Sequence, residues 1–344
     1  MRSDNREIIA LTSLRGIAAL WVLAFHLVAN LSISGYIAEP RGVAGRLLNG
    51  GEFAVDLFFV LSGYVLTLSA PQVMIYRDFI VRRVARVFPL HLLTLGVMAI
   101  GIGSALRGGV GTKDIAYFSF ASLPAHFSLT WAWFGMPLAW NSPTWSLSVE
   151  FAGYLVFPFV LTALRGASRP VRIALLLGAM AGQALLLTTT DYPSTGGLAL
   201  MRGAFGLTIG VLLRLLFVDR ALPGAGAAGL AVIAALSFGQ PGIAALCVAG
   251  LIVTMAHARE SRTERFMTAP PIAWLGRVSF SIYVLHVPVL IVLLQLLRRI
   301  PMLQTPGGLI VFSICYIGLV LASAAVTWRL VERRDQHMVR ALLA

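Results

Sequence analysis

The chain has 344 residues, of which 58% are hydrophobic and 12% are charged, and its mean hydropathy is +0.85. Soluble domains carry about 25% charged residues, so this composition excludes a soluble globular protein and indicates an integral membrane protein. The formal net charge of +13 does not indicate a nucleic-acid partner. The arginines stand in short clusters between apolar segments, where membrane topology signals lie.

Ten apolar segments are predicted to form transmembrane helices, because a span needs roughly 17 to 25 residues. In chain order the predicted spans are 8–31, 53–70, 84–105, 144–164, 171–190, 197–217, 223–239, 241–257, 272–297 and 307–331. The seventh and eighth are separated only by the sequence GQPG. The sequence therefore predicts an all-α polytopic membrane protein of about ten transmembrane helices. We expect a single transmembrane domain over residues 1–344 with no appended soluble domain.

The arginines orient these predicted helices. They gather in alternate connections, such as 77–86 and 165–172, whereas the intervening connections carry few basic residues. Basic residues are enriched on the cytoplasmic side, so we expect both termini in the cytoplasm and the protein in a bacterial inner membrane. The longest outer connection, 106–143, contains three tryptophans. It is interpreted either as an interfacial aromatic belt or as a lid over an outer-facing site.

Two ionisable residues fall within the first predicted span, LTSLRGIAALWVLAFHL. Arg15 and His26 are eleven residues apart, which is roughly three helical turns and about 16 Å of rise. Both side chains are therefore predicted on one face of the helix, at different depths. Ionisable residues inside a span usually face a cavity and mark a function. The pair predicts a polar central tunnel.

The predicted topology gives a depth to each polar residue. The inner half collects arginines with no carboxylate near them, namely Arg15, Arg82, Arg83, Arg86 and Arg277. Guanidinium groups bind phosphate oxygens in a fork, so we interpret the group as a site for a phosphorylated cytosolic ligand. The alternative, strongest for Arg82 and Arg83, is a set of topology anchors or lipid head-group contacts.

The outer half collects a different set, His26, His286, Asp56, Glu150 and Arg202. A histidine beside carboxylates suits general base catalysis, because imidazole takes a proton at neutral pH and an acid group can orient the ring. We predict His26 as the catalytic base, with Glu150 or Asp56 as its catalytic partner. Two alternatives stay open. Each histidine could make an interhelical hydrogen bond, and Asp56 could pair with Arg202.

A long, thin donor with phosphates at one end and a reactive group at the other would span the distance between the two sets. A coenzyme A thioester has that shape. A transporter or flippase for a lipid-linked sugar or an organic anion could use the same tunnel, without acyl transfer. The polar residues alone leave both hypotheses open.

Six stretches of the chain resemble the membrane acyltransferase type 3 family, which includes O-acetyltransferases of bacterial surface polysaccharides. They are LTSLRGIAALWVLAFHL, FAVDLFFVLSGYVLT, RRVARVFPLH, WNSPTWSLSVEFAGYLVFP, MRGAFGLTIG and LGRVSFSIYVLHVPV. The spacing of Arg15 and His26 matches one family hallmark, and FFVLSGY, which contains Ser62, matches a second.

The resemblance implies a ten-helix fold, an acyl-CoA donor drawn from the cytosol and an acceptor hydroxyl on the far side. We predict an O-acyltransferase that moves an acyl group, most readily acetyl from acetyl-CoA, to a hydroxyl of a cell-envelope saccharide such as an exopolysaccharide or a related glycoside. His26 would act as general base, with an acyl-histidine relay as a variant.

The predicted site residues follow from depth and resemblance together. The predicted donor-binding residues are Arg15, Arg82, Arg83, Arg86, Arg277 and Ser62, and the predicted acceptor-binding residues are Arg202, Tyr283, His286 and Trp145. We expect no metal and no permanently bound cofactor. The expected partners are acyl-CoA, the saccharide acceptor, the lipid bilayer and proteins of polysaccharide export or biosynthesis.

Overall fold

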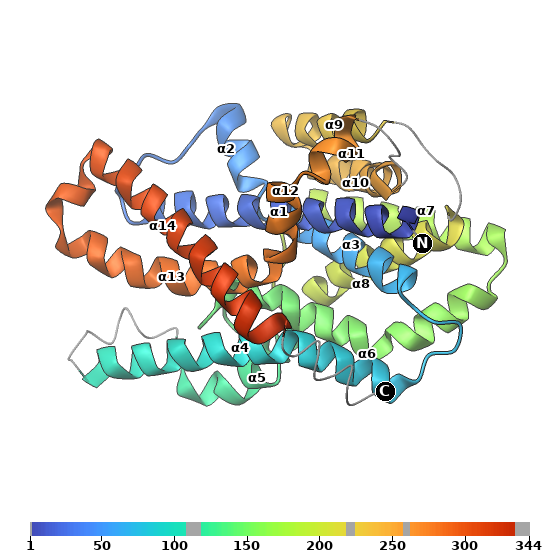
Figure 1. The fold of residues 1–344 in the computed structure, drawn as a ribbon, viewed down its shortest axis with the longest axis horizontal. Helices are drawn as coiled ribbons and strands as arrows, with labels where there is room; N and C mark the ends of the chain where they lie inside the picture. Colours follow the sequence, from blue (N-terminus) through green and yellow to red (C-terminus); the bar gives the residue numbers. More distant parts are fainter. Residues whose placement is uncertain (1, 108–117, 218–223, 257–261, 334–344) are drawn as a thin grey trace.

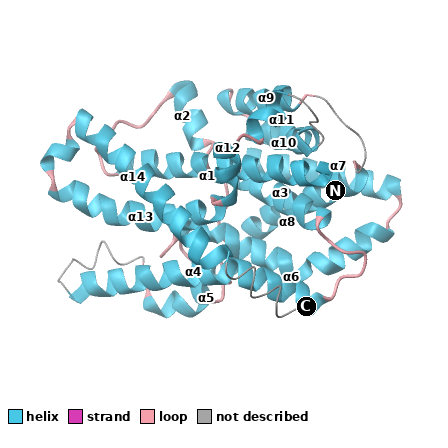
Figure 2. Cartoon of the chain, in the orientation of Figure 1, coloured by secondary structure: helices cyan, strands magenta, loops and turns pink. Residues whose placement is uncertain are grey.

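The computed structural model describes residues 2–107, 118–217, 224–256 and 262–333 (Figure 1). Throughout these ranges the chain forms helices joined by loops and turns (Figure 2). This confirms the predicted all-α class. In a bilayer the helix satisfies every backbone polar group within its own segment, which suits a chain of long apolar runs.

Within the described ranges, eight segments are long and apolar enough to cross a membrane. They comprise α1 (Arg2–Ile33), α2 (Gly42–Asn49) with α3 (Ala54–Leu68), α4 (Tyr76–Arg107), α6 (Trp145–Gly166), α7 (Arg169–Thr189), α8 (Gly196–Leu216), α13 (Ser279–Arg299), and α14 (Pro306–Thr327) with the π-helical turn η5 (Trp328–Glu332). The seventh and eighth predicted spans form α9 (Ala225–Ser237) and α10 (Pro241–Ala256), of 13 and 16 residues. At 1.5 Å per residue they measure about 20 and 24 Å, short of the roughly 30 Å hydrocarbon core.

The ninth predicted span, 272–297, is two helices in the structure. The short helix α12 (Pro270–Arg277) ends at Arg277, and α13 starts after a turn at Val278. The end of α12 is pressed against α1, since a Cβ placed on Gly276 would lie 2.5 Å from the carbonyl oxygen of Thr12. Arg277 is therefore exposed at a helix break and not buried within a span.

The remaining described elements are short. They are η1 (Phe120–Ser122), α5 (Leu123–Phe127), η2 (Trp131–Phe134), η3 (Ser142–Thr144), α11 (Arg262–Met267) and η4 (Pro301–Gln304). The beginning of α1 and the α3–α4 and α6–α7 connections lie at the same end of the bundle, on the right of Figure 1. Helix α1 contacts α3, α10, α12 and α13, so it runs through the interior with neighbours on several sides.

The connection before α6 folds inward instead of lying along a lipid interface. Trp131 and Trp140 are almost fully buried, and the His126 ring stacks on Trp131 with centroids 4.6 Å apart. Burial and the neighbouring His91 lower the pKa of His126 to about 4, so its ring is neutral at physiological pH. The aromatic-belt interpretation is therefore wrong for these two tryptophans. Residues 108–117 of the connection lie outside the described ranges.

Helices α3 and α8 approach closely through glycines, which gives a first testable expectation. A Cβ on Gly63 of α3 would lie 2.1 Å from the carbonyl oxygen of Leu207. Because backbone cannot yield as a side-chain end can, Gly63→Ala should lower the free energy of unfolding by about 1–3 kcal/mol or more. Thermal unfolding in detergent micelles measures the loss.

A matched control lies on α7. A Cβ on Gly178 would meet no heavy atom within 4 Å, so Gly178→Ala should leave stability equal or slightly higher. Equal melting temperatures for the two variants would show that α3 and α8 do not pack as closely as the structure has them.

Candidate active site

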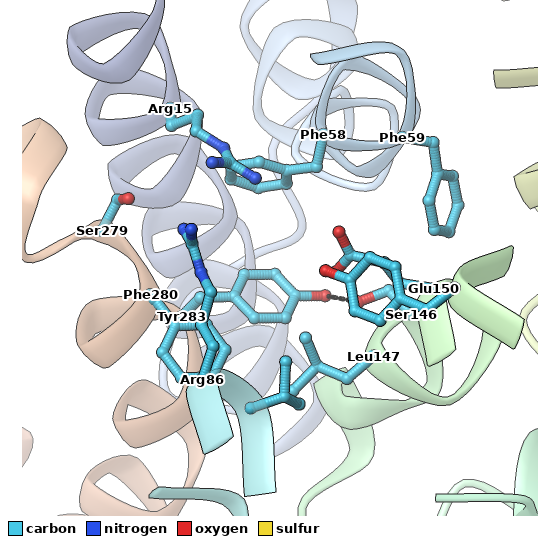
Figure 3. A pocket seen from close by; sticks show the side chains of 12 residues that line it. Arg15, Phe58, Phe59, Arg86, Ser146, Leu147, Glu150, Ser279, Phe280 and Tyr283 are labelled. Atoms are coloured by element: carbon cyan, nitrogen blue, oxygen red, sulfur yellow. Dashed lines mark hydrogen bonds between the residues drawn. The ribbon is translucent and has the colours of Figure 1, made fainter. Parts of the chain in front are cut away.

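One cavity lies between α1, α3, α4, α6 and α13, and we call it the arginine cavity. It is lined by Arg15, Phe58, Phe59, Arg86, Val87, Ser146, Leu147, Glu150, Tyr154, Ser279, Phe280 and Tyr283. Figure 3 shows the Arg15 and Arg86 guanidinium groups on one side of the cavity and the Glu150 carboxylate on the other. Two cations face one anion, so the lining favours a negatively charged ligand.

Glu150 belongs to the arginine cavity and not to the surroundings of His26. Its carboxylate accepts a hydrogen bond from the Ser62 hydroxyl, which joins α6 to α3. The prediction that the inner arginines have no carboxylate near them is wrong, because Glu150 lines the same cavity as Arg15 and Arg86. The Ser62 hydroxyl is engaged with Glu150, and its role in donor binding stays a prediction.

The predicted arginine cluster on α4 is divided between two places. Arg86 lines the arginine cavity, whereas Arg82 and Arg83 line a separate cavity at the end of α3. The Arg83 guanidinium lies 5.5 Å from the centroid of the Phe79 ring and 6.0 Å from that of Tyr154. Tyr154 lines the arginine cavity, so the Arg83 guanidinium lies close to one wall of that cavity. Arg277 contributes to neither lining.

A second cavity, which we call the histidine cavity, lies further along α1. It is lined by Val22, Phe25, His26, Gly51, Glu52, Val55, Leu138, Ser142, Pro143, Trp145, Ser194, Arg202 and Tyr283. Arg15 and His26 thus line successive cavities along the same helix, in agreement with their predicted placement on one face. About 16 Å of helix rise separates them.

The side-chain hydrogen-bond partner of His26 is a second histidine, His286. The Nδ1 atom of His26 lies 3.0 Å from the Val22 carbonyl oxygen and 3.2 Å from Nε2 of His286. A carbonyl oxygen can only accept, so Nδ1 of His26 carries a proton, and the neutral ring has its lone pair on Nε2. Among the described residues, no hydrogen bond occupies that Nε2 atom. His26, which lines the histidine cavity, therefore has a ring nitrogen that can act as a base.

The carboxylate of Asp56 is occupied elsewhere. Arg202 donates to both of its oxygens, from Nε at 2.9 Å and from a terminal nitrogen at 2.7 Å, and Gln183 donates at 2.6 Å. Asp56 is 2% exposed and Arg202 is fully buried. The predicted orientation of His26 by Asp56 or Glu150 is thus corrected, because the structure gives each carboxylate other partners. The alternative pairing of Asp56 with Arg202 is confirmed.

Arg202, predicted to bind the acceptor, is taken up by internal contacts. Besides Asp56, it donates to the carbonyl oxygens of Glu52 and Pro193, and its guanidinium lies 5.1 Å from the centroid of the Trp145 ring. Its effect on the histidine cavity is to hold Trp145 and the Glu52 backbone in place. Trp145 itself forms part of the cavity wall, and its predicted role in acceptor binding stays a prediction.

Tyr283 is the only described residue that lines both cavities. Its hydroxyl donates to the Pro143 carbonyl oxygen at 2.9 Å and lies 2.7 Å from the Ser146 hydroxyl (Figure 3). The predicted continuous tunnel is therefore two cavities that meet at the Tyr283 ring. Each has a volume of about 60 Å³, room for roughly four water molecules.

Sequence reasoning missed three residues of this arrangement. Gln183 donates a hydrogen bond to Asp56, Tyr154 lines the arginine cavity beside the Arg83 guanidinium, and Glu52 lines the histidine cavity. Gln183 carried a usable signal, since a lone amide in the predicted span 171–190 needs a partner inside the membrane. Tyr154 carried none, because an aromatic residue in a span usually packs against apolar neighbours.

Comparisons with known proteins agree with the geometry. The sequence profile of an acyltransferase domain family matches residues 8–329. Acyltransferase MdmB of Streptomyces mycarofaciens is 28% identical over 80% of this chain and 77% of that protein. Membrane-bound transacylase BcsY of Komagataeibacter xylinus, itself a putative assignment, is 26% identical over 93% and 81%.

Peptidoglycan O-acetyltransferase OatA of Listeria monocytogenes is 26% identical over 84% of this chain and 50% of that protein. The chain therefore spans about half the length of this relative. No solved structure matches the chain.

Proposed function

The chain belongs to this acyltransferase family, and from that premise we propose that it is an O-acyltransferase of the bacterial inner membrane. The donor would be acyl-CoA, with acetyl as the favoured acyl group, and the acceptor would be a hydroxyl of a cell-envelope saccharide. The relative named as a peptidoglycan O-acetyltransferase supports the acceptor class. The arrangement of two cavities on either side of Tyr283 supports a donor and an acceptor that meet from opposite directions.

The arginine cavity suits the thioester arm of the donor. The donor phosphates would bind at the mouth of this cavity through the Arg15 and Arg86 guanidinium groups, which suit phosphate oxygens. Their position would direct the narrow pantetheine arm into the cavity. The thioester would then reach the cavity junction beside Tyr283.

The histidine cavity suits the hydroxyl acceptor. His26 Nε2 would take the acceptor hydroxyl proton as that oxygen attacks the thioester carbonyl carbon. The carbon–sulfur bond would then break, and the His26 imidazolium would return its proton to the departing thiolate, giving free CoA and an O-acyl ester. Trp145 and Glu52 would form the aromatic and polar walls against which the saccharide lies.

The observation that carries the proposal is the position of His26, which lines the histidine cavity and whose Nε2 has no hydrogen-bond partner among the described residues, while the arginine cavity lies on the other side of Tyr283. The test is to purify the protein, supply acetyl-CoA and a saccharide acceptor, and detect acetylated saccharide by mass spectrometry. Product formation that free CoA inhibits is the expected result. Saccharide movement across a membrane with no dependence on acetyl-CoA would favour a transporter instead.

Substituting the arginines of the arginine cavity and of the cavity at the end of α3 should affect donor binding differently. Arg15→Gln and Arg86→Gln should each raise KM for acetyl-CoA by about 10-fold or more, because a hydrogen bond to a charged group contributes about 1.5–3 kcal/mol. Steady-state kinetics at saturating acceptor measure the change. Arg82→Gln should have a smaller effect, since Arg82 lines the other cavity and not the arginine cavity. Equal effects of all three substitutions would contradict the assignment of the donor to the arginine cavity.

A further inference from the structure

We propose that His286 is the positioning residue of His26, and that it fixes the tautomer in which Nε2 of His26 is the base. The inference rests on the proposed function and deepens it. It gives a neutral histidine the place that a carboxylate holds in the more familiar acid–histidine pairs.

The hydrogen bonds fix the protons on both rings. Nδ1 of His286 lies 2.7 Å from the Tyr283 carbonyl oxygen, so this nitrogen carries the proton and Nε2 of His286 is an acceptor. That acceptor faces Nδ1 of His26 at 3.2 Å. The proton on His26 Nδ1 is thus shared between the Val22 carbonyl oxygen and the His286 ring. Both acceptors hold the same tautomer.

The ring of His286 has little freedom to leave this position. It is fully buried, and the two imidazoles meet edge to face with centroids 4.8 Å apart. The Tyr316 hydroxyl donates to the His286 carbonyl oxygen at 3.2 Å, which ties α13 to α14. His286 therefore presents one fixed nitrogen to His26.

A hydrogen bond from Asn141 also holds the helical turn that carries His286. Pro288 has no backbone N–H, so it leaves the Val284 carbonyl oxygen without its helical partner. The side-chain amide of Asn141 donates to that oxygen at 2.8 Å. The contact joins α13 to the residue just before η3, whose Ser142 and Pro143 line the histidine cavity.

A neutral partner has a physical advantage at this depth. When His26 takes the acceptor proton, its Nδ1–H bond to His286 becomes charge-assisted and strengthens. A carboxylate in the same place would have to stay ionised inside the membrane between turnovers, which is costly without a partner. His286 stabilises the imidazolium only while the charge exists.

The test compares two substitutions of His286 with a buried histidine elsewhere. His286→Phe keeps an aromatic ring but removes the acceptor, so kcat should fall about 10- to 100-fold while both KM values stay within about twofold. His286→Gln restores an acceptor oxygen and should recover most of kcat. The control is His91→Gln, because His91 is also buried but bonds the His126 carbonyl oxygen, and its kcat should match the wild type.

Each outcome decides the inference. Unchanged kcat in His286→Phe, or a raised acceptor KM with unchanged kcat, would overturn positioning while the proposed function stands. Absence of acetyl transfer by the wild-type protein would instead overturn the proposed function, and this inference with it.

A measurement on the unsubstituted protein covers the case in which His286→Phe fails to fold. Nitrogen-15 NMR of histidine-labelled protein, with His26 assigned by its loss in His26→Ala, should show the His26 proton on Nδ1 and a coupling across the hydrogen bond from that nitrogen to Nε2 of His286. A proton on Nε2 of His26, or no coupling between the two rings, would overturn the inference.

Discussion

Replacing His26 with alanine should lower kcat for acyl transfer by about 10²- to 10⁴-fold, the usual contribution of a general base. The protein should still fold and bind donor, because His26 lies in the histidine cavity and the donor would occupy the arginine cavity. Steady-state acetylation of a saccharide, with acetyl-CoA binding measured in parallel, separates the two effects.

Asn30→Ala is the matched control for His26→Ala. Asn30 lies one turn further along α1, and its side chain donates to the His26 carbonyl oxygen without lining either cavity. Its kcat should stay within about twofold of the wild type. A His26→Ala protein that binds donor and retains full kcat would remove His26 from the chemistry.

Replacing Asp56 with leucine should destabilise the protein by about 3–5 kcal/mol, because the change leaves the fully buried Arg202 charged and without its carboxylate. The loss should appear in thermal or denaturant unfolding in detergent micelles, and as a lower yield of folded protein. Arg202→Met should cost a similar amount by stranding the Asp56 charge.

The double variant Asp56→Leu with Arg202→Met distinguishes a charge pair from two independent packing losses. It removes both charges together, so its stability should lie within about 1–2 kcal/mol of the wild type and above either single variant. Additive losses would show that the two side chains are not coupled as the 2.7 Å ion pair implies.

Hydrophobic runs were sufficient to predict the eight long helices, because each span must satisfy its own backbone in lipid. The face shared by Arg15 and His26 was also predictable, since it depends on the period of one helix. The break at Val278 was not, because hydropathy continues through it while the packing of Gly276 on α1 ends α12.

The sequence could not show which polar side chains form hydrogen bonds or ion pairs with one another. Depth along the membrane placed Asp56, Glu150 and His26 at similar levels, but it does not give the direction in which a side chain points. Asp56 and Arg202 are 146 positions apart, and His26 and His286 are 260 apart. Such pairs depend on how α1, α3, α8 and α13 pack, which one sequence does not specify.

Transfer across a sealed bilayer tests the central claim most directly, that an acyl group passes from a donor in the arginine cavity to an acceptor hydroxyl beside His26 in the histidine cavity. Proteoliposomes would enclose a soluble saccharide acceptor, and acetyl-CoA would be added outside. Acetylated saccharide inside the vesicles is the expected result, and vesicles that carry His26→Ala should form almost none. Acetylation that occurs only when donor and acceptor share one side, or saccharide that crosses unmodified, would contradict the claim.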